Sequence, residues 1–197
     1  MAYDGIVLKN VINEMQSLVG AKVNKIFEPD KNTIILSVYN GSNFAMLIDI
    51  SANNYRLNLA TTAKPNPLVA PNFCMVLRKY LINSKITAIY TIGLERIAYI
   101  EFESFNEMND KVKRTLVIEL MGKYSNVTLL NEQNYIIDAV KKFDGNGISR
   151  DIMPARKYIL PESDKLDYTS MSKNDFVNKV IGSDYKTIES ALCNIFT

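Results

Sequence analysis

The sequence predicts an α+β fold, with helices and antiparallel strands in separate stretches of the chain. Three observations predict it. Apolar residues from Tyr3 to Val19 recur at helical spacing. Thr33–Tyr39 and Phe44–Ile50 are rich in β-branched and aromatic residues, and the Asn40-Gly41 pair between them is a strong hairpin signal. Beyond Pro161 the apolar residues return to helical spacing.

The first helix carries a signal at each end. Asp4 stands where a carboxylate can accept hydrogen bonds from free N–H groups and meet the positive end of the helix dipole. Gly20 follows as a stop signal. Further along, Ala63–Asn72 holds three of the six prolines, which predicts a rigid connector. A short helix is then predicted at Phe73–Leu81.

The middle of the chain predicts further strands. They are expected at Tyr55–Leu59, Ile86–Ile92, Arg96–Phe105, Lys113–Leu120, Val127–Leu130 and Tyr135–Val140. Glu101, Glu103 and Glu119 alternate with apolar residues in these segments. Because side chains on a strand point alternately to its two faces, we expect these glutamates to face outward into solvent rather than to form a catalytic carboxylate pair.

Two helical segments are expected at the end of the given sequence. The first follows the cap-type residues Ser172 and Asp175 and ends near Gly182, and the second begins near Asp184. The apolar face of the second segment has no predicted partner within the 197 residues. This indicates either the boundary of a fragment or the start of a second domain.

Composition excludes several function classes. Hydrophobic residues make up 47% and charged residues 22%, so the chain can bury a core and is not disordered. The net charge is only +2, so a nucleic-acid site would have to arise from local clustering of Lys and Arg. Histidine is absent, which excludes Ser-His-Asp, Cys-His and HExxH sites within this sequence. We expect no metal or other cofactor.

The cysteines and the first residues bear on location. Cys74 and Cys193 are far apart and form no CxxC pair, and Cys74 lies among apolar residues like a small buried hydrophobe. The beginning of the sequence lacks the basic and apolar regions of a signal peptide, and no apolar run approaches the ~20 residues that span a bilayer. We therefore expect a cytoplasmic protein without membrane contact.

Two turn segments are candidate binding sites. Gly93-Leu94-Glu95-Arg96 lies between two predicted strands, where Arg96 could present its forked donors to a phosphate or a base edge, with Glu95 either holding it or accepting a hydrogen bond from a nucleobase. A hairpin turn with a solvated ion pair explains the same residues. Met121–Asn126 offers Lys123 for a phosphate and Tyr124 for stacking, and a tight β-turn is the alternative.

Other basic residues are weaker candidates. Arg78-Lys79 lies on the short helix, where long cationic side chains often flank an apolar face. Lys141-Lys142 and Arg150–Lys157 are further basic segments. For these segments a solvated face is the default expectation.

Taken together, the motifs resemble the N-terminal domain of the NFACT family, often labelled fibronectin-binding protein, over roughly residues 1–165. The segments that carry the resemblance are Asp49-Ile50-Ser51-Ala52 with Tyr55-Arg56-Leu57, the Pro65–Pro71 connector, Phe73–Leu81, Gly93–Ile97, Ile118–Asn126, and Asn131-Glu132 with Ile136-Ile137-Asp138. The combination is specific, although each segment alone is not.

The resemblance implies a fold and a function. The expected fold is a β-sandwich flanked by helices, similar to the N-terminal domain of formamidopyrimidine-DNA glycosylases, over residues 1–167. Residues 168–197 would be the first helices of a helix-hairpin-helix-type middle domain. Family members bind the large ribosomal subunit with stalled peptidyl-tRNA, recruit tRNA, and in bacteria support addition of alanine tails to stalled chains, so the implied role is non-enzymatic.

The resemblance also assigns residues. Glu95-Arg96 falls where the family usually has Asp-Arg, a pair implicated in tRNA engagement, and the glutamate keeps the charge while adding one methylene. Tyr80 and Tyr124 stand where many members have His. The RNA-contacting residues that we expect are Asp4, Arg56, Arg78, Lys79, Glu95, Arg96 and Lys123.

Two other functions compete with this interpretation. A surface adhesin that binds fibronectin is suggested by the family's older label, and the lack of a signal peptide argues against it. A DNA-binding, repair-like protein is suggested by the expected fold. The related glycosylases use an N-terminal proline amine as nucleophile, whereas this sequence has Ala2, so we expect no glycosylase or lyase activity.

Overall fold

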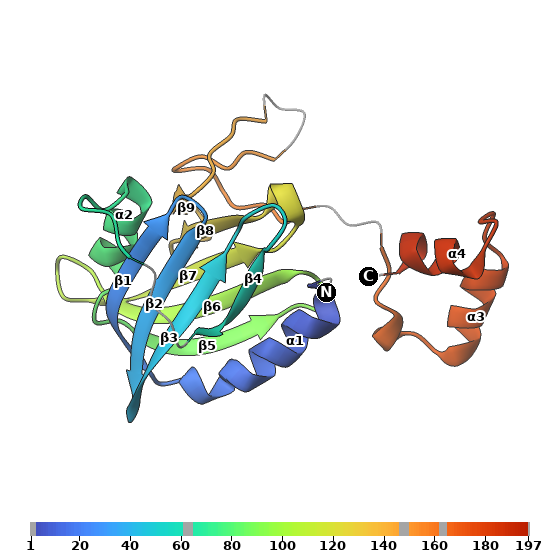
Figure 1. Cartoon of the computed structure of the whole chain (residues 1–197), viewed down its shortest axis with the longest axis horizontal. Coiled ribbons are helices and arrows are strands. Elements are labelled where there is room, and N and C mark those ends of the chain that lie inside the picture. Colours follow the sequence, from blue (N-terminus) through green and yellow to red (C-terminus); the bar gives the residue numbers. More distant parts are fainter. Residues whose placement is uncertain (1–2, 61–64, 146–149, 162–164, 197) are drawn as a thin grey trace.

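The computed structural model describes residues 3–60, 65–145, 150–161 and 165–196, and within them a large antiparallel sheet is flanked by helices (Figure 1). The helices are α1 (Gly5–Glu14), α2 (Asn72–Leu81), α3 (Lys173–Ile181) and α4 (Ile188–Ile195), with short 3₁₀ turns η1 (Met15–Leu18), η2 (Gly122–Tyr124) and η3 (Tyr168–Ser170). The strands are β1 (Lys22–Asp30), β2 (Thr33–Asn40), β3 (Ser42–Asp49), β4 (Arg56–Ala60), β5 (Lys85–Thr91), β6 (Ile97–Phe105), β7 (Lys111–Glu119), β8 (Asn126–Leu130) and β9 (Ile136–Ala139). The α+β expectation is confirmed.

The sheet folds into two layers. Its order among the described residues is β4-β3-β2-β1-β5-β6-β7-β8-β9. β1 and β5 share only the residue pair Lys22 and Lys85, so the sheet turns over on itself there. β1–β4 then lie against β5–β9, as the strand ribbons in Figure 1 show. The expected sandwich is present as one sheet, while the likeness to DNA glycosylases stays a prediction.

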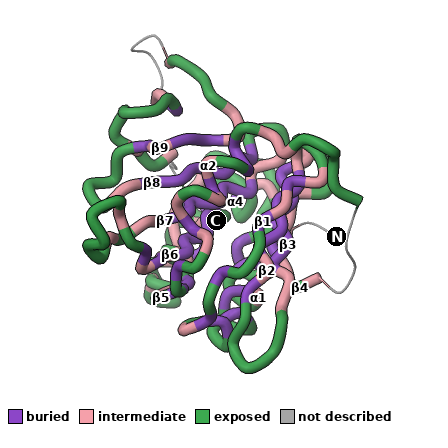
Figure 2. The backbone as a smooth tube through the Cα atoms, turned by 90° about the vertical axis from the view of Figure 1, so that its left-hand side faces the viewer, coloured by how far each residue is buried: buried purple, intermediate pink, exposed green. Residues whose placement is uncertain are grey.

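The main core lies between these two layers. Figure 2 shows buried stretches along strands of both layers. The largest fully buried side chain of the core is Phe102. The first layer contributes Leu36 and Met46, the second layer Ile100 and Ile118, and helices α1 and α2 contribute Leu8 and Leu77. Burial of apolar surface at roughly 25 cal/mol per Å² makes this core the principal source of stability.

The first helix forms as the sequence predicts. The carboxylate of Asp4 caps α1 by accepting a hydrogen bond from the Val7 N–H at 2.9 Å. Gly5 follows directly, and a Cβ atom on it would lie 1.8 Å from the carbonyl oxygen of Leu94. Only glycine permits this approach, which seats the start of α1 on the loop between β5 and β6.

The second helix covers the other end of the sandwich. α2 packs on β1, and Cys74 is fully buried there, as expected, with Sγ 3.6 Å from the Ile26 carbonyl. The connector before it was expected at residues 63–72, of which 63 and 64 lie outside the described residues. Helix α2 begins at Asn72, after Pro71.

A second, smaller core lies on the outer face of β6–β9. Ile152 and Tyr158, from the segment 150–160, pack against Ile97 and Val117 of the sheet. We call this segment the strap. It covers Glu119, whose side chain points outward as alternation predicts but is 0% exposed.

The expectation that Glu119 faces solvent is therefore wrong. Its carboxylate accepts a hydrogen bond at 2.9 Å from Arg150 Nη1, a short contact from Arg150 Nη2, and a hydrogen bond at 2.9 Å from the Tyr158 hydroxyl. The solvated-face expectation also fails at Arg150, whose side chain is only 17% exposed. Glu101 and Glu103, beyond the strap, form ion pairs with Lys113 and Lys111.

Helices α3 and α4 lie apart from the sheet (Figure 1). Ser172 caps α3 by accepting from the Asp175 N–H, and α3 ends at Gly182, as the sequence predicts. The Phe176 and Phe196 rings pack against each other with centroids 4.7 Å apart. The domain boundary at residue 167 stays a prediction. Among the described residues, no helix has the length and apolar character needed to cross a membrane.

Candidate nucleic-acid interface

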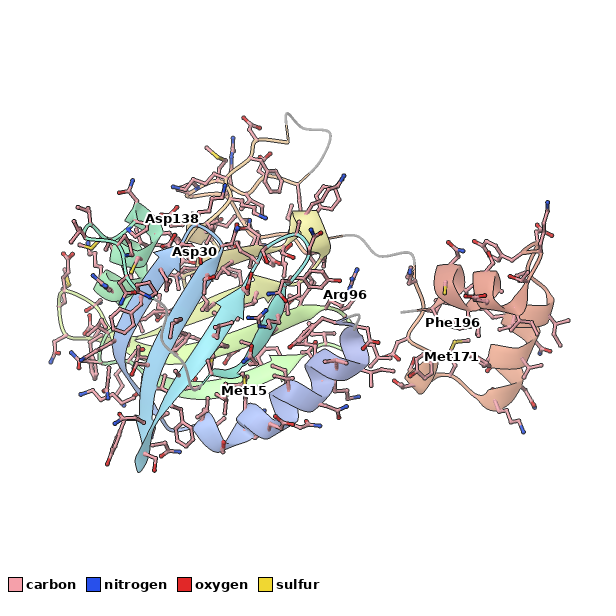
Figure 3. The ribbon with its side chains drawn as sticks, viewed as in Figure 1. Met15, Asp30, Arg96, Asp138, Met171 and Phe196 are labelled. Atoms are coloured by element: carbon pink, nitrogen blue, oxygen red, sulfur yellow. The ribbon has the colours of Figure 1, made fainter. Side chains whose placement is uncertain are left out.

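The loop between β5 and β6 presents the two residues singled out in the sequence. Gly93 adopts φ +56°, a backbone conformation that favours glycine. The Glu95 N–H donates to the Ile92 carbonyl at 3.1 Å and the Leu120 N–H donates to the Arg96 carbonyl at 2.8 Å, so the loop is fixed at both ends. Arg96 is exposed at the end of the sandwich nearer α3 and α4 (Figure 3).

The guanidinium of Arg96 is only lightly bonded. Its Nη1 lies 3.4 Å from the hydroxyl of Tyr55, at the long limit of a hydrogen bond. Among the described residues it forms no ion pair, and Glu95 therefore does not hold it as the sequence interpretation supposed. An arginine has five N–H donors, so most of this fork is open to a ligand.

The turn η2 lies beside the same tyrosine. Gly122 has φ +60°, and a Cβ atom on it would lie 3.7 Å from the Ala52 carbonyl oxygen and 3.9 Å from the ring of Tyr55. Lys123 places Nζ 4.9 Å from the ring centroid of Tyr124, which is 69% exposed. This end of the molecule therefore combines an open guanidinium, an ammonium and an exposed aromatic ring.

Asp4 and Arg56 occupy the same end but are engaged within the fold. Asp4 accepts from Val7, and Gly5 joins its helix to the Arg96 loop. Arg56 lies 3.7 Å from Asp49 and donates to the Asn54 carbonyl at 3.2 Å. The structure thus brings together five predicted residues, which we call the loop-end surface: Asp4, Arg56, Glu95, Arg96 and Lys123.

Arg78 and Lys79 do not join this surface. They lie on α2, on the opposite side of the sandwich from the Arg96 label (Figures 1 and 3). Arg78 donates from Nε to the Ile26 carbonyl at 2.9 Å, and Lys79 pairs with Glu107 at 3.4 Å. The sequence could not separate the two groups, because chain order does not reveal which end of the sandwich a residue occupies.

Several groups near the loop-end surface have shifted pKa values. Burial raises the pKa of Tyr3 to about 12, and the hydroxyl of Tyr3 donates to the Leu57 carbonyl at 2.6 Å. Burial lowers the pKa of Lys141, whose Nζ donates to the Lys123 carbonyl at 3.3 Å. A hydrogen bond from Thr169 lowers the pKa of Asp167, whose carboxylate lies beside Gly93.

The exposed groups at this end of the molecule suit the binding of a nucleic acid. A planar guanidinium recognises a phosphate or a base edge, and an exposed aromatic ring accepts a stacked base. Across the described residues there is no group of three His, Cys, Asp or Glu side chains able to hold a metal ion. Sequence reasoning missed Tyr3 and Tyr55 as components, although their positions next to Asp4 and Arg56 were a usable signal.

Solved structures with the same fold define the class of protein. The N-terminal domain of the fibronectin-binding protein PavA from Streptococcus pneumoniae is 27% identical, with a TM-score of 0.89 over 99% of this chain and 74% of that one. The fibrinogen binding protein from Staphylococcus aureus is 30% identical, with a TM-score of 0.88 over 100% of this chain and 70% of that one.

Sequence comparison then gives the family. Residues 4–197 match the model described as NFACT N-terminal and middle domains, so the chain belongs to the NFACT family. A protein named Rqc2 homolog RqcH from Bacillus subtilis is 31% identical over 90% of this chain and 32% of its own length. A protein of the same name from Streptococcus pneumoniae is 32% identical over 83% of this chain and 30% of its own length. The chain spans about a third of these relatives.

Proposed function

We propose that this chain is the RNA-binding N-terminal part of a ribosome-associated quality-control factor. In this role it recruits tRNA, with alanyl-tRNA the expected species, to large ribosomal subunits that hold a stalled peptidyl-tRNA. Membership of the NFACT family and the relatives named Rqc2 homolog RqcH support this role. The protein acts as a cytoplasmic adaptor, and the peptidyl-transferase centre of the ribosome supplies the chemistry.

The observation that carries the RNA contact is the open fork of Arg96, which meets Tyr55 as does the η2 turn that carries Lys123 and Tyr124. Among the described residues, the guanidinium of Arg96 reaches only the Tyr55 hydroxyl at 3.4 Å, which leaves donors for a phosphate or a base. Lys123 adds a positive charge and Tyr124 a stacking surface. Glu95, which forms no ion pair with Arg96 among the described residues, is available to accept from a base amino group.

Binding of tRNA to Arg96 variants tests this contact. We expect Arg96→Ala to weaken tRNA binding by about 1–3 kcal/mol if the partner is a base edge, and Arg96→Lys to lose most of the same affinity because an ammonium lacks the fork. If the partner is a phosphate, Arg96→Ala loses less affinity and its tRNA binding depends less steeply on salt, while Arg96→Lys binds tRNA almost as well as the unchanged protein. Measurement at two salt concentrations separates the two cases. Equal affinity for all three proteins at both salts would contradict the contact.

A fibronectin-binding role is the second candidate, and the names of the solved relatives favour it. Immobilised fibronectin and tRNA can be offered to the same set of proteins. Our proposal predicts that Arg96→Ala impairs tRNA binding, and that in fractionated cells the full-length protein migrates with free large ribosomal subunits. Its recovery mainly at the surface of intact cells would favour the adhesin instead.

The proposed role is non-catalytic. The glycosylases of the expected fold use an N-terminal amine as nucleophile, and Ala2, which would carry that amine after loss of Met1, lies outside the described residues. Borohydride trapping on DNA with an abasic site tests this. We expect no covalent adduct, and an adduct at Ala2 would support the repair-like alternative.

A further inference from the structure

A groove of about 380 Å³ lies on the outer face of the second layer, and its lining among the described residues includes none of the RNA-contacting residues assigned above. Its lining includes Tyr90 of β5, Tyr99 and Glu101 of β6, Lys113 of β7 and Tyr158 of the strap. Tyr90 and Tyr99 are direct cross-strand partners, so they stand side by side on the same face of the sheet. Tyr158 and Leu160 of the strap line the groove together with Tyr90.

The two tyrosine rings form a prepared stack. Their centroids are 5.0 Å apart and their planes differ by 10°. Tyr99 is 8% exposed and Tyr90 is 36% exposed, so Tyr99 is the buried support and Tyr90 the accessible ring. The Tyr90 hydroxyl donates to Glu101 at 3.0 Å, and Lys113 anchors Glu101 at 2.8 Å. The accessible ring is thus held at its polar edge before any ligand arrives, which lowers the entropic cost of binding.

The wall of the groove is equally fixed. Tyr158 lines it and donates at 2.9 Å to the buried carboxylate of Glu119, which also binds Arg150. A buried, charge-assisted network of this kind has few alternative arrangements. The groove is therefore part of the folded structure rather than a gap beneath a loose segment.

The chemistry of the groove fits an unpaired nucleobase. Paired aromatic residues on the open face of an antiparallel sheet stack bases without regard to sequence, because every base has a flat π surface. Glu132 and Asn134 line the groove and can bond the polar edge of a base. Lys157 also lines it and, among the described residues, forms no ion pair, so it is available to the adjoining phosphate.

We propose that this groove binds one unpaired base of an RNA strand, stacked on Tyr90, with its phosphate near Lys157. The proposal rests on the proposed RNA-binding function and adds a second contact that selects single-stranded RNA. In a duplex the bases are stacked and paired inside the helix, so they cannot reach the ring. β6 and β7, which form most of the floor, are each paired on both sides, so a peptide cannot add to either of them as a strand.

Fluorescence anisotropy with a short labelled oligoadenylate tests the groove. We expect Tyr90→Ala to bind it roughly tenfold more weakly, as for loss of one base–aromatic stack, and Tyr90→Phe to keep most of the affinity. Tyr39→Ala is the matched control, since Tyr39 is 49% exposed and lies on β2 in the other layer. We expect it to bind as the unchanged protein does. Thermal unfolding of each variant checks that the fold is intact.

Two further probes separate base stacking from attraction to the backbone. An abasic oligonucleotide of the same length and a duplex of the same strand should both bind the unchanged protein at least tenfold more weakly than the single strand. Equal affinity for Tyr90→Ala and Tyr39→Ala, or tight binding of the abasic chain, would overturn the proposal. A groove that holds a peptide would give the first of these results.

The groove and the loop-end surface can fail separately. Arg96→Ala tests the loop-end surface through tRNA binding, and Tyr90→Ala tests the groove through oligoadenylate binding. If the unchanged protein binds tRNA but not the single strand, the groove proposal is wrong and the loop-end surface stands. If Tyr90→Ala alone weakens RNA binding, the groove stands and the assignment of Arg96 is wrong.

Discussion

Arg96 and Arg78 are residues of one type, predicted from the sequence to play one role, yet the structure treats them differently. Arg78 donates from Nε to the Ile26 carbonyl at 2.9 Å and is half-buried against β1. Arg96 is exposed, and its nearest partner is a tyrosine hydroxyl at 3.4 Å. The difference teaches that a cation is a candidate for binding only to the extent that the fold leaves its donors free.

Arg150 has even fewer free donors than Arg78. Both of its terminal nitrogens bond Glu119, and its Nη1 also reaches the Ile159 carbonyl at 3.2 Å. Its terminal nitrogens are occupied by Glu119 of β7, so its role is to hold the strap on the sheet.

The largest effect is expected for Arg150→Ala. Removal of one partner from a buried ion pair leaves the other charge unpaired, and Glu119 is 0% exposed. We expect the free energy of unfolding to fall by about 3–5 kcal/mol, measured by urea denaturation. The double variant with Glu119→Gln should lose less than Arg150→Ala alone, because the unpaired charge is gone. A loss below ~1 kcal/mol in the single variant would mean that the pair is solvated.

Gly5→Ala should have the next largest effect on stability. The new Cβ would lie 1.8 Å from the carbonyl oxygen of Leu94, which is backbone and cannot swing aside. We expect a loss of about 1–3 kcal/mol from overpacking, together with weaker tRNA binding because the Arg96 loop must move. Gly41→Ala is a useful comparison, since Gly41 has open space around it but a φ of +75°. A Gly5→Ala protein with normal stability would show that α1 does not seat the loop.

The pH dependence of stability tests the burial of Tyr3. Its pKa is raised from 10.0 to about 12 in the folded protein, so above pH 10 the unfolded chain loses this proton first. Stability from Tyr3 is fully present below pH 10 and falls as the pH approaches 12, by on the order of 2 kcal/mol. Tyr3→Phe should lack this part of the decline. Identical pH profiles from pH 9 to pH 12 for the two proteins would contradict the assignment.

The smallest stability effect separates the two roles considered for Asp4. If Asp4 acts as a helix cap, Asp4→Ala should lower the free energy of unfolding by about 1 kcal/mol, and Asp4→Asn should lower it little because Asn caps equally well. If Asp4 serves RNA binding only through the cap, Asp4→Asn should also bind tRNA normally. A tRNA-binding defect in Asp4→Asn, with unchanged thermal stability, would show that the carboxylate itself contacts the partner.

Local sequence signals predicted most of the fold. The Asp4 cap, the Asn40-Gly41 hairpin and the Gly182 stop are set by neighbouring residues, and each lies where the sequence indicates. The burial of Glu119 could not be predicted this way. Alternation correctly gives the face of the sheet, but the strap that covers that face arrives about 30 residues later in the chain.

The candidate site was predictable in part for the same reason. The turns at Gly93 and Gly122 could be predicted, because each is a glycine between two predicted strands. Tyr55 contacts both turns, through Arg96 and through Gly122, and this depends on tertiary packing that the sequence does not show. Arg78 and Arg96 looked alike because sequence shows the charge of a side chain and not the carbonyl that it bonds. The tyrosine pair of the groove was equally hidden, since Tyr90 and Tyr99 meet only through strand pairing.

The most direct test is to measure tRNA affinity and the free energy of unfolding together for Arg96→Ala and Arg78→Ala. The account predicts opposite outcomes. Arg96→Ala should lose about 1–3 kcal/mol of tRNA binding and at most ~1 kcal/mol of stability. Arg78→Ala should lose about 1 kcal/mol or more of stability, because the buried Ile26 carbonyl loses a charge-assisted donor, and should bind tRNA normally. Normal tRNA binding by Arg96→Ala together with weakened binding by Arg78→Ala would contradict it.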